Sequence, residues 1–285
     1  MSDLALAVVF AVFIWWFSTG IVLLLNRMSR GAVVLALLLS SLLGLAALMG
    51  LAHTSQQTGI AGAYCAFTCA LLVWGWHELS FLTGWITGPR KTALPPGLPE
   101  GRRFVEAVRT ILWHEIGIVA AGVAIVAITW GAPNQVGTGT FLVLWVMRTS
   151  AKLNLYFGVR NLSEQFLPRH LAYLESAFRR RPVNLLFPVS VTGASLVLAL
   201  LVVQARHVAT PGATAVGMTL VATLLALAIV EHWMLVLPLD TTALWRWAMR
   251  EAPHPGPVSS PAVGSTAPVL SKLSLDADDN LLRAR

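Results

Sequence analysis

The sequence predicts an all-α membrane protein with about seven transmembrane helices, and three observations support this fold class. Hydrophobic residues occupy 56% of the 285 positions and charged residues only 12%, and the mean hydropathy is +0.71. Soluble domains carry roughly 25% charged residues. The apolar residues also fall in blocks of about 20, the length of helix that crosses a bilayer core. A soluble enzyme, a disordered chain and a disulfide-rich secreted protein are therefore excluded.

Short polar or proline-containing connectors separate the apolar stretches, and we expect one transmembrane domain over residues 1–250. The remaining residues, 251–285, are rich in Pro, Ser and Ala and are expected to form a flexible cytoplasmic tail. The expected spans are 4–25, 31–52, 60–87, 104–130, 136–158, 185–203 and 213–237.

The distribution of positive charge predicts the orientation. An odd number of spans places the two termini on opposite sides of the membrane. With a periplasmic N-terminus, 19 of the 20 Lys and Arg residues lie on the cytoplasmic side, and only Arg206 lies outside. Cytoplasmic connectors carry the excess of Lys and Arg in membrane proteins. We therefore expect a periplasmic N-terminus and a cytoplasmic C-terminus.

An amphipathic helix is expected at the cytoplasmic surface over residues 167–181, because its apolar residues recur at helical spacing. Such a helix can lie in the plane of the lipid headgroups, with its basic residues attracted to anionic lipid. A basic loop that only sets the topology is the alternative. The residues expected to contact the membrane surface are Arg179, Arg180 and Arg181.

Three adjacent His–Glu pairs, each beside a tryptophan, lie inside the apolar stretches, at similar expected depth near the cytoplasmic side. Ionisable residues inside a membrane are costly, and each is therefore a candidate for function. The candidate metal or pigment ligands are His77, Glu78, His114, Glu115, Glu231 and His232.

Three polar residues of the fifth span, Arg148, Lys152 and Asn154, are the expected charge partners of these pairs. Four interpretations of the cluster stay open. It can be an ion-pair lock, because buried charges need partners. It can hold a transition metal such as iron, which His and carboxylate ligands suit, although the Glu-x-x-His spacing of di-iron bundles is missing. A histidine can instead ligate the magnesium of a tetrapyrrole pigment, or the cluster can relay protons or a solute.

Short motifs that follow one another in consistent order carry a resemblance over about residues 70–250. Together they resemble the PuhE family of photosynthetic complex assembly proteins in purple and related phototrophic bacteria. The motifs are His77-Glu78 and residues 83–90, 130–135, 144–154, 158–161, 187–191 and 231–233.

The resemblance implies a multi-pass protein of the bacterial inner, or intracytoplasmic, membrane, whose gene lies beside that of the reaction-centre H subunit. It implies an accessory role in photosynthetic complex assembly or bacteriochlorophyll biosynthesis, more in keeping with a binding protein than with an enzyme. The expected ligands are partner proteins and, as a further candidate, pigment or its precursors. The implied partners are reaction-centre and light-harvesting subunits or their assembly factors, with the di-iron oxidative cyclase as a further candidate. No catalytic residue is carried over.

A function of a different class stays open beside this one. In it, the chain is an intramembrane His/Glu metalloenzyme, or an essential subunit of the cyclase, in bacteriochlorophyll synthesis. The candidate cofactors are a transition metal, with iron favoured, or a magnesium tetrapyrrole. Nucleic acid is not an expected partner, because no basic patch interleaved with aromatic residues occurs.

Overall fold

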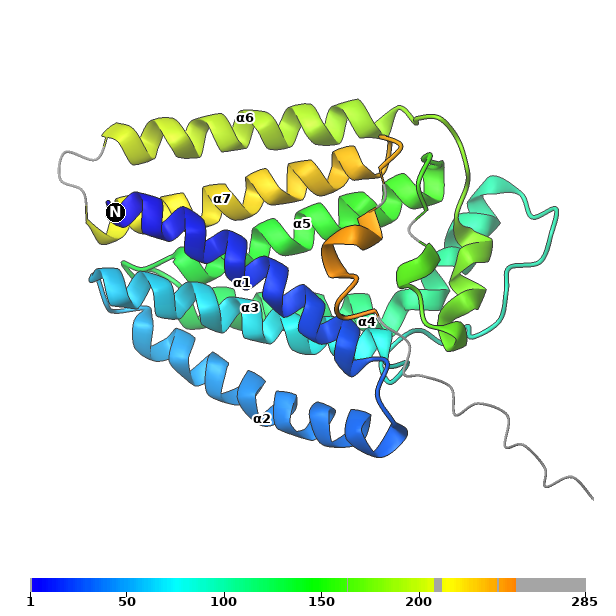
Figure 1. Ribbon diagram of the computed structural model, residues 1–285, viewed down its shortest axis with the longest axis horizontal. Coiled ribbons are helices and arrows are strands. Elements are labelled where there is room, and N and C mark those ends of the chain that lie inside the picture. Colours follow the sequence, from blue (N-terminus) through cyan, green and yellow to red (C-terminus); the bar gives the residue numbers. More distant parts are fainter. Residues whose placement is uncertain (1, 163, 208–211, 240, 250–285) are drawn as a thin grey trace, which may run out of the picture. The chain divides into compact units, whose positions relative to one another are not determined.

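Every regular element in the described residues is helical, which confirms the all-α class (Figure 1). The computed structural model describes residues 2–162, 164–207, 212–239 and 241–249, so the expected tail lies outside the described residues. The long helices are α1 (Asp3–Leu25), α2 (Arg30–Thr54), α3 (Ile60–Leu82), α4 (Glu100–Thr129), α5 (Val136–Phe157), α6 (Leu186–His207) and α7 (Ala213–Met234).

Six of these helices, all except α5, are long and apolar enough to cross a membrane, which confirms a multi-pass membrane protein. The expectation of about seven spans differs at α5. This helix has 22 residues, but Arg148, Lys152 and Asn154 make its second half polar. It packs against α3, α4, α6 and α7. The orientation of the bundle across the membrane stays a prediction.

The centre of the bundle is formed by α3, α5 and α7. Half of the apolar window of α3 is buried, compared with 11% of the windows of α2 and α6. Glycines permit the closest helix contacts, as is common in membrane proteins. A Cβ atom at Gly217 of α7 would lie 2.4 Å from Val136 Cγ2, and one at Gly137 of α5 would lie 2.3 Å from Leu51 Cδ2.

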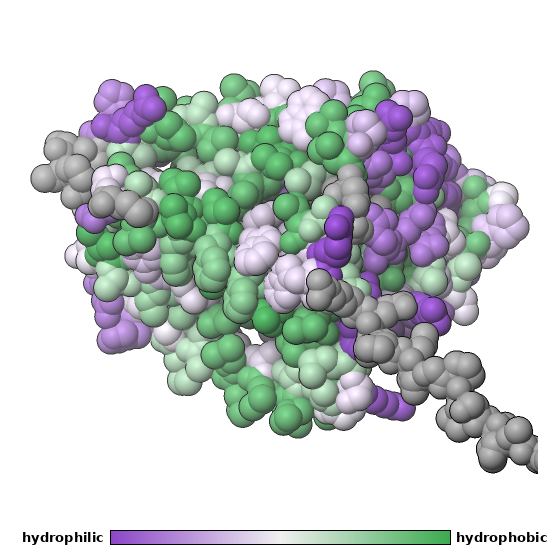
Figure 2. Space-filling model, in the orientation of Figure 1, coloured by the Kyte–Doolittle hydropathy of each residue, from purple (hydrophilic) through white to green (hydrophobic). Residues whose placement is uncertain are grey.

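Apolar and polar residues occupy different parts of the bundle surface. Figure 2 shows apolar side chains over the sides of the helices, while hydrophilic side chains gather at the end that carries the longer connectors. The large apolar side chains of α2 are among the most exposed, as expected for a helix that faces lipid. We call the end that carries residues 83–99 and 158–185 the basic end.

The third span is shorter than the expected 60–87, because α3 ends at Leu82. Gly84 follows with φ +79°, a left-handed conformation that ends a helix and that glycine adopts at low cost. Residues 83–91 then form an irregular segment, which we call the docked segment. Helix α4 begins at Glu100, before the expected residue 104.

The docked segment lies directly on the backbone of α4. The Thr87 carbonyl accepts a hydrogen bond from the backbone N–H of His114 at 2.9 Å, and the Arg90 N–H donates to the Arg109 carbonyl at 3.2 Å. Between them, a Cβ atom at Gly88 would lie 2.1 Å from the Arg109 carbonyl oxygen. Only glycine therefore permits this approach.

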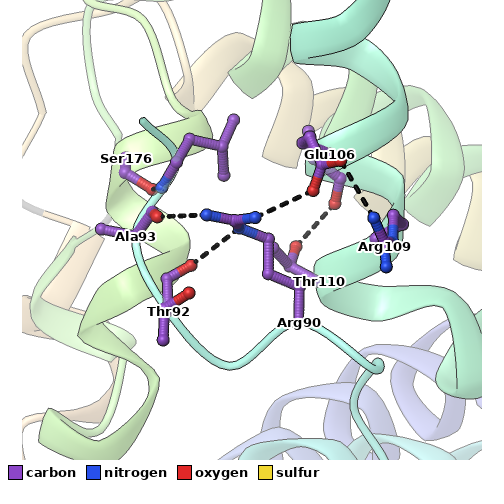
Figure 3. Close-up of polar contacts among 9 residues, drawn as sticks. Arg90, Thr92, Ala93, Glu106, Arg109, Thr110 and Ser176 are labelled. Atoms are coloured by element: carbon purple, nitrogen blue, oxygen red, sulfur yellow. Dashed lines mark hydrogen bonds and ion pairs between the residues drawn. The ribbon is translucent and has the colours of Figure 1, made fainter. Parts of the chain in front are cut away.

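Arg90 fixes the connector that follows the docked segment (Figure 3). Its guanidinium pairs with Glu106 of α4 at 2.9 Å and donates to the carbonyls of Thr92 at 3.2 Å and Ala93 at 2.8 Å. Glu106 also pairs with Arg109 at 3.0 Å. A single arginine thus holds both the turn of the connector and the first part of α4.

The helix expected over 167–181 is corrected by the structure. The segment contains a 3₁₀ helix, η2 (Arg169–Ala177), in place of an α-helix. Its Leu171 and Leu174 are 1% and 4% exposed and pack against the end of α3. Because these leucines are buried against protein, they cannot insert into the headgroup plane.

The three arginines after η2 have partners within the described residues. Arg179 pairs with Glu100, and Arg180 pairs with Glu164 at 3.2 Å. The side chain of Arg181 packs against Gly158. Their contact with the membrane surface stays a prediction.

Two further helix ends differ from the expected spans, because α6 continues to His207 and α7 ends at Met234.

Replacing Gly88 with alanine should destabilise the protein, because the new methyl group would force the docked segment away from α4. We expect the free energy of unfolding in detergent to fall by about 1–3 kcal/mol, the usual cost of overpacking. The control is Gly101→Ala in α4, where nothing lies within 4 Å of the added Cβ. Equal stability of the two variants would contradict the close approach.

Candidate functional site

Two of the three expected glutamates form ion pairs with cations of α5. Glu78 of α3 lies 3.3 Å from the Arg148 guanidinium. Glu115 of α4 accepts a hydrogen bond from Lys152 Nζ at 2.6 Å. Arg148 and Lys152 are four residues apart on one helix and therefore present their charges on the same face. The two pairs join α3, α4 and α5.

The third glutamate, Glu231 of α7, has its hydrogen-bond partner on α1 and not on α5. Its carboxylate accepts a hydrogen bond from the indole Nε1–H of Trp15 in α1 at 2.9 Å. It also interacts electrostatically with Arg148, which links it to the two ion pairs. Three carboxylates and two cations thus connect four helices, and the Trp15 indole adds α1 as a fifth. We call the residues Glu78, Glu115, Arg148, Lys152 and Glu231 the ion-pair cluster.

The histidines point away from this cluster, because neighbouring side chains on a helix diverge by about 100°. His77 and His114 lie beside each other, with ring centroids 6.4 Å apart, and are 4% and 0% exposed. The His114 ring also lies 4.5 Å from the Phe81 ring. Neither ring nitrogen of His114 has a hydrogen-bond partner among the described residues.

His232 belongs to a separate, uncharged network. Its Nδ1–H donates to the Ala228 carbonyl at 2.9 Å, since a carbonyl can only accept. Its Nε2 accepts a hydrogen bond from the Ser150 hydroxyl at 2.9 Å, and that hydroxyl oxygen lies 2.8 Å from Ser190 Oγ of α6. The Asn154 amide donates to the Ser150 carbonyl at 3.0 Å. This network joins α5, α6 and α7.

Asn184 extends the network to the start of α6. Its side-chain amide donates to Asn154 Oδ1 at 3.0 Å, and its carbonyl oxygen accepts from the backbone N–H groups of Leu186 and Phe187 at 2.8 and 3.2 Å. Asparagine is favoured as a capping residue at the start of a helix, and this signal could have identified Asn184 from the sequence. The sequence offers no comparable signal that Trp15 contacts Glu231.

The arrangement is unfavourable for a metal centre or a pigment site. No group of three His, Cys, Asp or Glu side chains in the described ranges is close enough to hold a metal ion. The rings of His77, His114 and His232 are at most 4% exposed, so a tetrapyrrole macrocycle cannot reach their nitrogens unless the helices separate. What the contacts do provide is charge neutralisation between helices.

Replacing Lys152 with methionine should strongly destabilise the protein, because Glu115 would keep its charge among the helices without a partner. We expect a loss of about 3–5 kcal/mol in the free energy of unfolding. Adding Glu115→Gln should recover most of this loss. Denaturant titration in detergent, followed by circular dichroism, measures both.

The matched control is Arg109→Met, which removes an ion pair with Glu106 at the basic end. Arg109 is 52% exposed, and Glu106 keeps its contact with Arg90. A loss of only about 0–1 kcal/mol is expected for such a pair. Equal losses in Lys152→Met and Arg109→Met would show that the intramembrane pair is not a structural lock.

Replacement by leucine should cost little stability at His114 and measurable stability at His232. His114→Leu removes two buried nitrogens without a protein partner, so the free energy of unfolding should stay within about 1 kcal/mol of its original value. His232→Leu removes two hydrogen bonds and should cost about 1–3 kcal/mol. Thermal unfolding of both variants in one detergent tests this. A larger loss for His114→Leu would show that its nitrogens have a stabilising partner.

Comparison with known proteins places this chain in a family. The chain is similar to the protein described as "Uncharacterized 30.4 kDa protein in puhA 5'region" from Rhodobacter capsulatus, with 37% identity over 273 residues. The match covers 94% of this chain and 99% of that protein. No solved structure matches the chain. The family model described as "Protein of unknown function (DUF3623)" matches residues 1–255, and the chain therefore belongs to the DUF3623 family.

Proposed function

We propose that this chain is an accessory membrane protein in photosynthetic complex assembly or bacteriochlorophyll biosynthesis, and that it acts by binding partner proteins. The support from comparison is the location of the Rhodobacter capsulatus relative, which its description places in the puhA 5' region. The motifs that resemble the PuhE family support the same role, since that family is associated with the gene of the reaction-centre H subunit. The implied location is the inner, intracytoplasmic membrane.

The observation that carries this proposal is the pairing of the glutamates in the ion-pair cluster. The carboxylates of Glu78, Glu115 and Glu231 each have a partner on another helix. A catalytic site needs groups that are free to meet a substrate, whereas these groups are used to hold helices together. The cluster therefore supports a scaffold more than an enzyme.

The outer helices offer surface for the proposed partners. Along α6, Val189, Leu196 and Leu200 are 66%, 63% and 62% exposed. Helices of reaction-centre or light-harvesting subunits, or of their assembly factors, can pack on such an apolar face within the bilayer. The di-iron oxidative cyclase is a further proposed partner.

A metalloenzyme is the second candidate, and one observation favours it. His77 and His114 lie side by side, and neither ring nitrogen of His114 has a hydrogen-bond partner among the described residues. One or two transition-metal ions per chain in protein purified from its native membrane, lost in His77→Ala/His114→Ala, would support this candidate over the accessory role.

Exchange of an ion pair for a neutral pair tests the accessory role. In a phototrophic host without its own copy of the gene, Lys152→Met should fail to restore the absorbance of assembled reaction-centre and light-harvesting complexes, because the protein is destabilised. Glu115→Gln/Lys152→Met should restore both the protein level and most of this absorbance. Membrane absorbance spectra and immunoblots measure the two quantities.

The informative comparison is between protein level and complex level. Double-variant protein that accumulates normally without restoring the complexes would show that the charged groups take part in chemistry, and would contradict a scaffold role. Affinity purification after crosslinking, from the same membranes, should recover reaction-centre or light-harvesting subunits with the double variant as with the original chain.

A further inference from the structure

A cavity at the basic end is distinct from the ion-pair cluster. Its volume is about 680 Å³, within the usual range for small-molecule sites. Three parts of the chain that are distant in sequence line it: the α1–α2 connector with the first turn of α2, the docked segment, and η2. The lining residues are Asn26, Met28, Arg30, Val33, Val34, Thr83, Gly84, Trp85, Thr87, Lys91, His170, Leu171 and Tyr173.

Three polar atoms in the cavity wall are buried without a partner. Thr87 is 2% exposed, and its hydroxyl has no hydrogen-bond partner among the described residues. The same holds for the Tyr173 hydroxyl and for Asn26 Oδ1. Buried polar groups nearly always have a partner in folded proteins. Three such atoms around one cavity indicate a polar ligand.

The charge of the cavity wall favours an anion. Arg30 and Lys91 line the cavity, and neither takes part in an ion pair within the described ranges. No acidic side chain is among the described lining residues. Helix α2 begins at Arg30, and the side chain of its N-cap residue, Ser29, makes no capping hydrogen bond. The free N–H groups of this first turn add positive potential.

The apolar part of the wall favours a lipid as the source of the anion. Val33 and Val34 line the cavity beside Trp85, which is 63% exposed. Tryptophan in such a position is typical of the membrane–water interface. From the cavity, the exposed apolar face of α2 continues along the bundle through Leu35, Leu38 and Leu42. Acyl chains can lie along this face while a phosphate occupies the cavity.

We propose that this cavity binds the phosphate group of an anionic phospholipid, with Arg30 and Lys91 contacting the phosphate and Tyr173 donating a hydrogen bond. This lipid site does not depend on the proposed function. The bound lipid joins the α1–α2 connector, the docked segment and η2.

Native mass spectrometry of the full chain, stripped of lipid in mild detergent, tests the proposal. Phosphatidylglycerol, phosphatidylcholine with the same acyl chains, and glycerol 3-phosphate are each titrated. One phosphatidylglycerol per chain should bind at least about tenfold more tightly than phosphatidylcholine, since two cations contact the anion. Arg30→Gln/Lys91→Gln should remove this preference. Tyr173→Phe should weaken binding by about threefold, as for the loss of one hydrogen bond.

The matched control is Arg102→Gln/Arg160→Gln, which removes two exposed cations that do not line the cavity. Binding by this control should equal that of the original chain. Equal loss in both double variants would show attraction by net charge only and would overturn a defined site. Equal affinity for glycerol 3-phosphate and phosphatidylglycerol would overturn the assignment to lipid and identify a soluble phosphate compound. Thermal unfolding confirms that each variant is folded.

Discussion

The two cations of α5 are the constraint around which the bundle is organised. A charged residue at the centre of a membrane helix costs roughly 2.5–3.5 kcal/mol on insertion scales. Arg148 and Lys152 reduce this cost by meeting Glu78 of α3 and Glu115 of α4. Since α5 is too polar to count as a span on its own composition, its position depends on these neighbours. Charge pairing thus adds to apolar packing in holding the central helices together.

The docked segment connects the ion-pair cluster to the cavity at the basic end. Its Thr87 carbonyl accepts a hydrogen bond from the backbone N–H of His114, one residue before Glu115, and both Thr87 and Lys91 are lining residues of the cavity. The segment is thus fixed on one side by α4 and presents polar groups on the other. The resemblance includes residues 83–90, and this double role gives a physical reason for a distinctive sequence there.

Much of the fold follows from local sequence. Apolar blocks of sufficient length predict the long helices, because the bilayer requires each backbone hydrogen bond to be satisfied within its own segment. The predictions were wrong where tertiary contacts overrode periodicity. The leucines of 167–181 have helical spacing, yet they pack on α3 in a 3₁₀ helix. Residues 83–87 are apolar enough to continue α3, yet Gly84 and the contact with α4 end that helix.

The sequence by itself determined that this chain is a helical, multi-pass membrane protein, and it identified which residues inside the spans carry charge. Only the tertiary structure decided how those residues divide. Glu78 and Glu115 pair with cations of α5, whereas Glu231 bonds to Trp15 of α1. His77 and His114 lie beside each other, and His232 contacts Ser150. The reason is rotational: spacing along one helix fixes depth, but the direction of a side chain has meaning only when the neighbouring helices are placed.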